Sequence, residues 1–211
     1  MCDDLLFLFY KLDSITFNHS IRVMGIAREV EDFYDMDCHV VSEAALVHDI
    51  GKVYISSKIL DKPDRLSGLE RGLIDLHPYI GYRLLRDFGI SEELCRIVLY
   101  HHGTSPATLE ELPPPEDDSI YDEAMLLNSI DAFEALTSDR PYHVGCHVTE
   151  AFEIMHGESG HHEKFMYYLE HIMKGGANSK DSLIFRNGLA SRPSFQNVFL
   201  GFYKPKFTFD K

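Results

Sequence analysis

The sequence has few basic residues and no closely spaced pair of cysteines, and each shortage excludes a class of protein. Its 20 Lys and Arg residues against 34 Asp and Glu residues give a net charge of −14, which argues against a DNA or RNA duplex as a partner. Its four cysteines, Cys2, Cys38, Cys95 and Cys146, form no CxxC pair. We therefore expect free thiols in a reducing cytoplasm rather than a disulfide framework.

The sequence also lacks an apolar run long enough to cross a membrane. The apolar stretch at residues 5–10 is far too short to span a bilayer, and Asp3 and Asp4 precede it where a signal peptide would be basic. We expect neither membrane insertion nor a signal peptide, and we read this stretch as the start of a packed helix. The 211 residues, 45% of them apolar, suffice for one domain with a core and a short appendage.

Helical periodicity dominates the first 174 residues, in which neither an internal repeat nor a set of alternating strands is evident. A capping box at Ser67 and Glu70 opens one helix, and Gly51 is expected to stop another. The predicted helices are residues 17–34, 43–50, 67 towards 77, 79–88, 91 towards 101, 121–136, 149–156 and 161–174. We expect an all-α domain at residues 1–174 and a Phe-rich extension at residues 175–211, whose structure the pattern leaves open.

Seven imidazole and carboxylate side chains are candidate metal ligands. They are His19, His48, Asp49, His77, His101, His102 and Asp131. Each one alone is more often a hydrogen-bonded surface or core residue than a ligand. Nitrogen and oxygen donors without thiolates suit manganese, iron or zinc better than calcium or magnesium, and seven exceed the four that one zinc ion needs. If they converge, they form a two-metal centre of the kind that hydrolyses phosphate esters, and the dications offset the acidic charge that would repel such a substrate.

The order of these residues resembles the HD-GYP branch of the HD phosphohydrolase superfamily. The matching positions are residues 48–52 and 59–63, Leu66, Glu70, His77, Pro78, Gly81, His101, His102 and residues 130–142. The resemblance implies an all-α, HD-domain helical bundle that hydrolyses the bacterial messenger cyclic di-GMP at two or three metal ions. It implies the seven residues as ligands, with Asp49 bridging the ions. It also implies that Lys52 and Arg140 hold the substrate phosphates.

The chain departs from this family pattern at two places. Members with three metals carry Glu four residues before the first His, where this chain has Ile15; we therefore expect two divalent transition-metal ions. Iron or manganese is favoured, and zinc or nickel stays open. After His102 the family continues with Glu and a Gly-Tyr-Pro motif, but this chain continues Gly103-Thr104-Ser105-Pro106 and carries a degenerate loop.

Three functions follow from these observations. The leading hypothesis is a metal-dependent phosphodiesterase with Asp49 and Lys52 as catalytic residues, which converts cyclic di-GMP to pGpG or GMP. The second is an HD hydrolase of another nucleotide or phosphate ester. The third is a degenerate domain that binds a messenger or partner without turnover, which the altered loop favours and the seven costly polar ligands oppose. The sequence leaves an upstream sensor domain and a homodimer open.

Overall fold

The computed structural model describes residues 2–36, 39–103, 118–139, 144–158 and 163–175, and these residues are helical with no strand among them. Their elements in chain order are α1 (Cys2–Lys11), α2 (Ser14–Phe33), α3 (Val40–Val47), the 3-10 helix η1 (Ile50–Tyr54), α4 (Ser57–Leu60), α5 (Gly68–Ile74), α6 (His77–Asp87), α7 (Glu92–Tyr100), α8 (Asp118–Thr137), α9 (Val148–Gly157) and α10 (Glu163–Gly175). The predicted all-α class is therefore confirmed. None of the described helices is long and apolar enough to cross a membrane.

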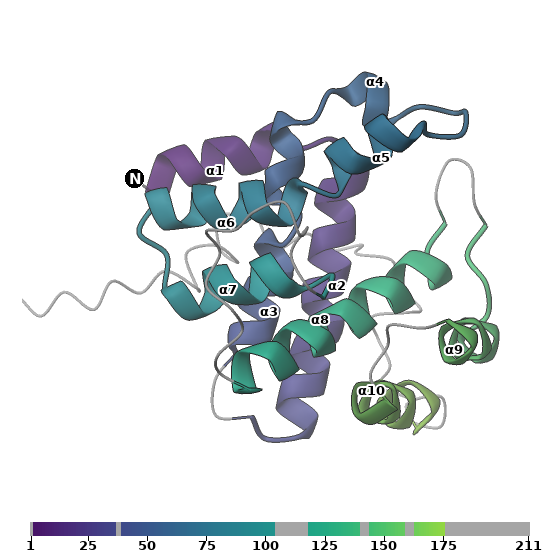
Figure 1. The fold of residues 1–211 in the computed structure, drawn as a ribbon. Helices are drawn as coiled ribbons and strands as arrows, with labels where there is room; N and C mark the ends of the chain where they lie inside the picture. The colour runs from purple at the N-terminus through teal and green to yellow at the C-terminus, as the bar shows by residue number, and fades with distance from the viewer. Residues whose placement is uncertain (1, 37–38, 104–117, 140–143, 159–162, 176–211) are drawn as a thin grey trace, which may run out of the picture. The chain divides into compact units, whose positions relative to one another are not determined.

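The long helix α2 forms the centre of the bundle and contacts α3, α8 and α10 (Figure 1). It begins after Asp13, whose carboxylate accepts hydrogen bonds from the backbone N–H groups of Ile15 and Thr16 at 2.9 and 2.8 Å. Such a cap satisfies N–H groups that have no partner within the helix. Its apolar stripe includes Val23 and Val30, which are fully buried against the neighbouring helices. The helix predicted at residues 17–34 is confirmed, with one more turn at its start.

The capping signals in the sequence mark real helix starts. Ser67 and Glu70 form both hydrogen bonds of a capping box at the start of α5, and the Ser91 side chain accepts a hydrogen bond from the Leu94 N–H at the start of α7. The predicted stop at Gly51 is wrong in detail, because α3 ends at Val47 and the 3-10 helix η1 runs through Gly51. Gly51 has a different reason to be glycine, which concerns the contact between η1 and α6.

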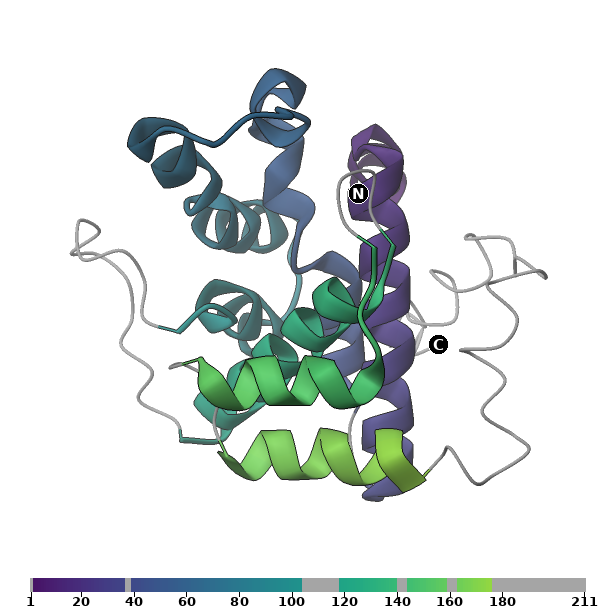
Figure 2. The same cartoon turned by 90° about the vertical axis from the view of Figure 1, so that its right-hand side faces the viewer.

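The last two described helices, α9 and α10, pack side by side against α8 (Figure 2). Both were predicted from apolar periodicity, and Phe152 of α9 stacks on Phe133 of α8 with ring centroids 5.1 Å apart. The N-terminal stretch also behaves as predicted, since Leu5 and Phe9 of α1 are buried. The predicted extension at residues 175–211 lies outside the described residues apart from Gly175, so the domain division stays a prediction.

Candidate metal centre

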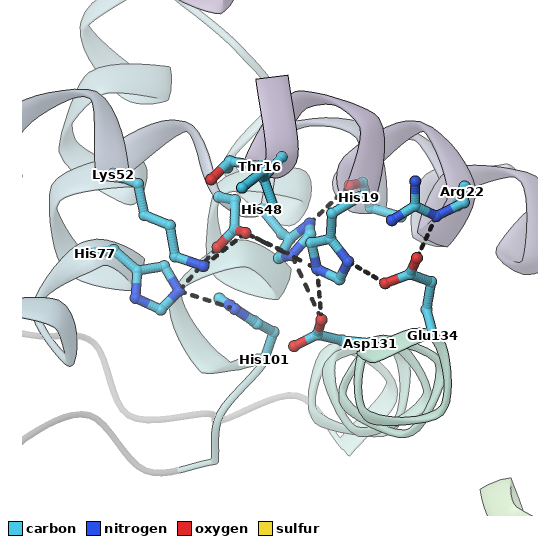
Figure 3. A network of polar contacts seen from close by, with 12 residues as sticks. Thr16, His19, Arg22, His48, Lys52, His77, His101, Asp131 and Glu134 are labelled. Atoms are coloured by element: carbon cyan, nitrogen blue, oxygen red, sulfur yellow. Dashed lines mark hydrogen bonds and ion pairs between the residues drawn. The ribbon is translucent and has the colours of Figure 1, made fainter. Parts of the chain in front are cut away.

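The seven candidate ligands come together from five parts of the chain, mostly from helix ends. Figure 3 shows His19, His48, His77, His101 and Asp131 among them. His48 and Asp49 lie between α3 and η1, His77 is the first residue of α6, and His101 follows the last residue of α7. The other members are His19 on α2, His102 after His101, and Asp131 on α8. His19 and Asp131, which lie 112 positions apart in the sequence, thus share one site.

Three histidines are held in the same orientation by their own backbone. The Nδ1 atoms of His48, His77 and His101 each donate a hydrogen bond to a carbonyl oxygen three residues earlier, at 2.7, 2.7 and 2.6 Å. A proton fixed on Nδ1 leaves the lone pair of Nε2 free, which is the arrangement that metal-binding histidines adopt. The Nε2 atom of His48 is fully buried and forms no hydrogen bond with any described residue. These three rings therefore fit metal coordination.

The carboxylate of Asp49 lies at the middle of the cluster. Its Oδ1 atom is 3.3 Å from Nε2 of His77, and its Oδ2 atom is 3.4 Å from Nε2 of His48 and 3.9 Å from Nε2 of His19. Burial alone would raise the pKa of Asp49, but the electrostatic influence of His48 and Lys52 outweighs burial and holds this pKa well below its usual range. Asp49 is therefore an anion with one oxygen facing each side of the site.

The donor atoms fall into two groups that Asp49 separates. On one side, donor atoms of His19, His48 and Asp131 all lie within 4.8 Å of one another, and on the other side those of His77, His101 and His102 do the same. A third such group, formed by His48, Asp49 and His101, joins the two. This is an arrangement that can hold two cations with a carboxylate between them. The donor set, nitrogen and oxygen without sulfur, fits divalent transition-metal ions.

Electrostatics keep most of the cluster ready to bind a cation. Burial lowers the pKa of His77 to about 4, and burial followed by the neighbouring histidines lowers the pKa of His101 as well. Burial also lowers the pKa of His102. Burial would raise the pKa of Asp131, but its hydrogen bond from His19 brings this pKa below its usual range. Neutral imidazoles and ionised carboxylates are the forms that bind metals.

An ion pair beside the cluster, between the buried Glu134 and the half-buried Arg22, was not identified from the sequence. Glu134 accepts hydrogen bonds from Nδ1 of His19 and from Nε of Arg22, as Figure 3 shows. On the other side of the ring, Nε2 of His19 lies 2.8 Å from Oδ1 of Asp131. Burial alone would lower the pKa of His19, but the bonds to Asp131 and Glu134 raise it to about 9. Glu134 thus makes this ring more basic and fixes which nitrogen faces the centre.

Helical spacing was the signal that could have revealed this pair. Glu134 follows Asp131 by three residues on α8, and Arg22 follows His19 by three residues on α2. Residues three apart lie on the same face of a helix. Two facing pairs of this kind predict a contact once α2 and α8 are known to pack together, which the sequence alone does not tell.

Replacing Glu134 by Gln tests whether this residue tunes His19. Gln keeps an oxygen that can accept the hydrogen bond from His19 but removes the negative charge. We expect the affinity for a divalent metal to fall by roughly 10- to 100-fold, as for other partners of metal-binding histidines. Titration against a chromogenic chelator measures this change. Glu93→Gln makes the same chemical change at an exposed position on α7 and should leave affinity unaltered; equal affinities in the two variants would exclude the role.

Gly51 allows η1 and α6 to touch through their backbones. A Cβ atom on Gly51 would lie 2.1 Å from the carbonyl oxygen of His77 and 2.8 Å from the backbone nitrogen of Gly81. Neither is a flexible side chain that could move aside, so any larger residue must push the two elements apart. Because Asp49 precedes η1 and His77 begins α6, this contact sets the distance between two candidate ligands.

A cavity of about 680 Å³ opens onto the cluster and gives a substrate access to it. His19, Asp49, His77, His102 and Asp131 line it together with Lys52. The Nζ atom of Lys52 lies 2.7 Å from Oδ2 of Asp49, so this predicted phosphate-binding residue faces both the cluster and the cavity. Ile15 also lines the cavity; it stands where the resemblance predicts Glu in members with three metals. Arg140, the other residue predicted to hold phosphate, lies outside the described residues.

Comparison with known proteins gives a family match across the whole cluster. The family model described as the HD domain matches residues 16–136. A cyclic di-GMP phosphodiesterase of Pseudomonas aeruginosa is 33% identical over 154 residues, which are 71% of this chain and 37% of that protein. A 3′3′-cGAMP-specific phosphodiesterase of Vibrio cholerae is 32% identical over 66% of this chain and 31% of its own length. The chain thus spans about a third of the length of these relatives.

Solved structures show the same fold. The HD domain of the phosphodiesterase PgpH from Listeria monocytogenes, solved in complex with cyclic di-AMP, superposes with a TM-score of 0.57 at 20% identity. The match covers 82% of this chain and 98% of that domain. A protein of Bdellovibrio bacteriovorus described as an HDG"Y"P protein gives a TM-score of 0.54 at 21% identity over 74% of this chain and 52% of its own chain. At these identities the likeness concerns the fold.

Proposed function

Because the chain belongs to the HD domain family, we propose that its helical domain is a metal-dependent phosphodiesterase that hydrolyses a cyclic dinucleotide. The observation that carries this proposal is the convergence of seven imidazole and carboxylate groups on one cavity. Two relatives named for cyclic di-GMP and 3′3′-cGAMP support the substrate class. Cyclic di-GMP is the substrate we propose first, because several of the similar proteins are named for it.

The two groups of donors support two metal ions rather than one. His19, His48 and Asp131 would hold one ion, His77, His101 and His102 the other, and Asp49 would contribute one oxygen to each. Bound divalent ions supply a water activated near neutral pH and stabilise the charge of the transition state. Iron and manganese are favoured by the donor set, and zinc and nickel remain compatible with it.

The protein residues have separate tasks in this reaction. Hydrolysis adds water across one P–O3′ bond, which leaves a 5′-phosphate and a 3′-hydroxyl on a linear dinucleotide. Lys52 lies at the cavity and would balance negative charge on the phosphate oxygens. Arg140 would add a second positive charge. Glu134 would keep Nε2 of His19 directed at the centre throughout.

A substrate panel with metal removal tests this proposal. Protein loaded with manganese or iron is incubated with cyclic di-GMP, 3′3′-cGAMP, cyclic di-AMP and bis(p-nitrophenyl) phosphate, and products are separated by chromatography. We expect cyclic di-GMP to be cleaved, a chelator to abolish cleavage, and added manganese to restore it. Cleavage of a different ester would support an HD hydrolase of another substrate. Stoichiometric metal without cleavage of any substrate would show a binding domain and contradict the proposal.

A cytoplasmic location, an upstream sensor domain and a homodimer stay predictions from the sequence. The loop that departs from the family pattern falls mainly at residues 104–117, which also lie outside the described residues.

A further inference from the structure

The cavity over the metal cluster carries more negative than positive charge among the described residues that line it. Asp49, Asp75 and Asp131 contribute three carboxylates, whereas Lys52 and Arg71 contribute two cations. One donor of Lys52 is already engaged, because its ammonium group lies 2.7 Å from a carboxylate oxygen of Asp49, which leaves its other donors for a phosphate at the cluster. Metal ions would offset the negative charge of the two carboxylates in the cluster. They would not offset the negative charge on the part of the cavity wall that α5 forms. An anionic ligand that extends away from the metals therefore finds one other cation there, Arg71.

The guanidinium of Arg71 is available for a ligand. Arg71 is an exposed residue of α5, and its side chain forms no ion pair or hydrogen bond with any described residue. Asp75 lies four residues later on the same side of the chain, yet the two charges do not pair. An Arg followed by an acidic residue at this spacing is also the less favourable orientation for a helical ion pair. Arg71 thus lines the cavity, and its donors have no partner among the described residues.

Hydrogen bonds at both ends of α5 define the place of the helix that carries Arg71. At its start, the capping box of Ser67 and Glu70 is reinforced by Lys62, whose ammonium lies 2.8 and 2.7 Å from the two oxygens of Glu70. At its end, the carbonyl oxygen of Ile74 accepts the hydrogen bond that orients His77. Because Ile74 lies one turn after Arg71, the position of Arg71 is tied to that of a candidate metal ligand.

We propose that Arg71 binds the second phosphate of a cyclic dinucleotide while the first phosphate lies at the metal cluster and Lys52. A cyclic dinucleotide carries two phosphodiesters on opposite sides of its ring, so a site that grips both needs positive charge away from the metals. A guanidinium offers a planar fork of donors that matches two phosphate oxygens. Arg71 would therefore select dinucleotides over esters that have a single phosphate. This inference rests on the proposed function.

Kinetics with two substrates test the proposal. Wild type and Arg71→Gln are compared on cyclic di-GMP, which has two phosphates, and on bis(p-nitrophenyl) phosphate, which has one. For cyclic di-GMP we expect KM to rise roughly tenfold with kcat little changed, as for loss of one exposed charge-assisted hydrogen bond. For bis(p-nitrophenyl) phosphate we expect both constants to stay within about twofold, because the metal cluster that binds its phosphate is intact. Arg71→Lys should recover part of the loss, since it restores charge without the fork.

Arg65→Gln is the matched control. It removes the same charge from an exposed residue before α5 that is not part of the cavity wall, and we expect wild-type kinetics on both substrates. An unchanged KM for cyclic di-GMP in Arg71→Gln, or an equal loss on both substrates, would overturn the inference. If wild type cleaves bis(p-nitrophenyl) phosphate but no cyclic dinucleotide, the proposed function itself fails, and that outcome is visible before any variant is made.

Discussion

Asp49→Asn is expected to remove most of the bound metal and to abolish hydrolysis. The Asp49 carboxylate is 1% exposed, and its two oxygens face candidate ligands on both sides of the site. Asn has one oxygen and one NH₂ group, so it cannot offer an oxygen to each side, and its NH₂ group has no lone pair with which to bind a cation. Loss of a residue that only hydrogen-bonds to a metal ligand typically lowers activity roughly 10- to 100-fold. We expect kcat to fall by more than this, because Asp49 is itself a candidate ligand. Element analysis and turnover of cyclic di-GMP measure the two effects.

Asp64→Asn is the control for this substitution. It makes the same chemical change in an exposed residue of the segment before α5, outside the cavity wall, and should leave metal content and activity as in wild type. Circular dichroism should show that both variants remain helical, because Asn is close to Asp in size. Full turnover by Asp49→Asn, or a full complement of metal, would remove the bridging role and with it the two-ion arrangement proposed here.

Gly51→Ala is expected to destabilise the domain and weaken metal binding together. The added Cβ would meet the backbone of α6 at 2.1 Å, a distance that no side-chain movement can relieve. Overpacking of this kind typically costs about 1–3 kcal/mol, and we expect the upper end of that range. For a domain of this size a loss of about 3 kcal/mol lowers Tm by roughly 6–12 °C. Metal affinity should fall as well. Asp49 directly precedes η1 and His77 begins α6, so these two candidate ligands would move apart when η1 and α6 are pushed apart.

Gly25→Ala separates this steric effect from the general effect of replacing a glycine. Gly25 lies within α2, and a Cβ there would meet nothing within 4 Å. Alanine in a helix interior is favoured over glycine by about 0.5–1 kcal/mol, so Tm should stay level or rise. Thermal unfolding followed by circular dichroism measures both variants. If Gly51→Ala unfolds at the wild-type temperature and binds metal normally, the contact between η1 and α6 does not control the site.

Much of the helical architecture could be read from local pattern. The apolar period at residues 17–34 and the capping box at Ser67 depend on neighbours within a few residues, which a sequence displays directly. Gly51 shows where this reasoning fails. A glycine after an apolar helix is normally a stop signal, but here its reason is the close approach of α6, thirty positions later at Gly81. No local pattern distinguishes those two causes.

The candidate ligands could be identified from the sequence because their imidazole and carboxylate side chains suit metal binding and follow the order of a known family. The supporting residues were not, because their roles depend on which helices pack together. Glu134 could have been any buried acid until α8 was placed against α2, where it meets His19 and Arg22. In the sequence, nothing distinguishes Arg71 from other charged residues of a helix. Its proposed role depends on the cavity that it lines.

The amino-acid sequence by itself thus determined the helical class, most helix limits, the family and the types of donor atom available for a metal. The tertiary structure alone decided that His19 and Asp131 meet at 2.8 Å, that Asp49 lies between two groups of donor atoms, and that Arg71 on the cavity wall has no partner among the described residues. The reason is that helix formation depends on hydrogen bonds four residues apart. A shared site depends on contacts between residues far apart in sequence, which exist only once the helices have packed.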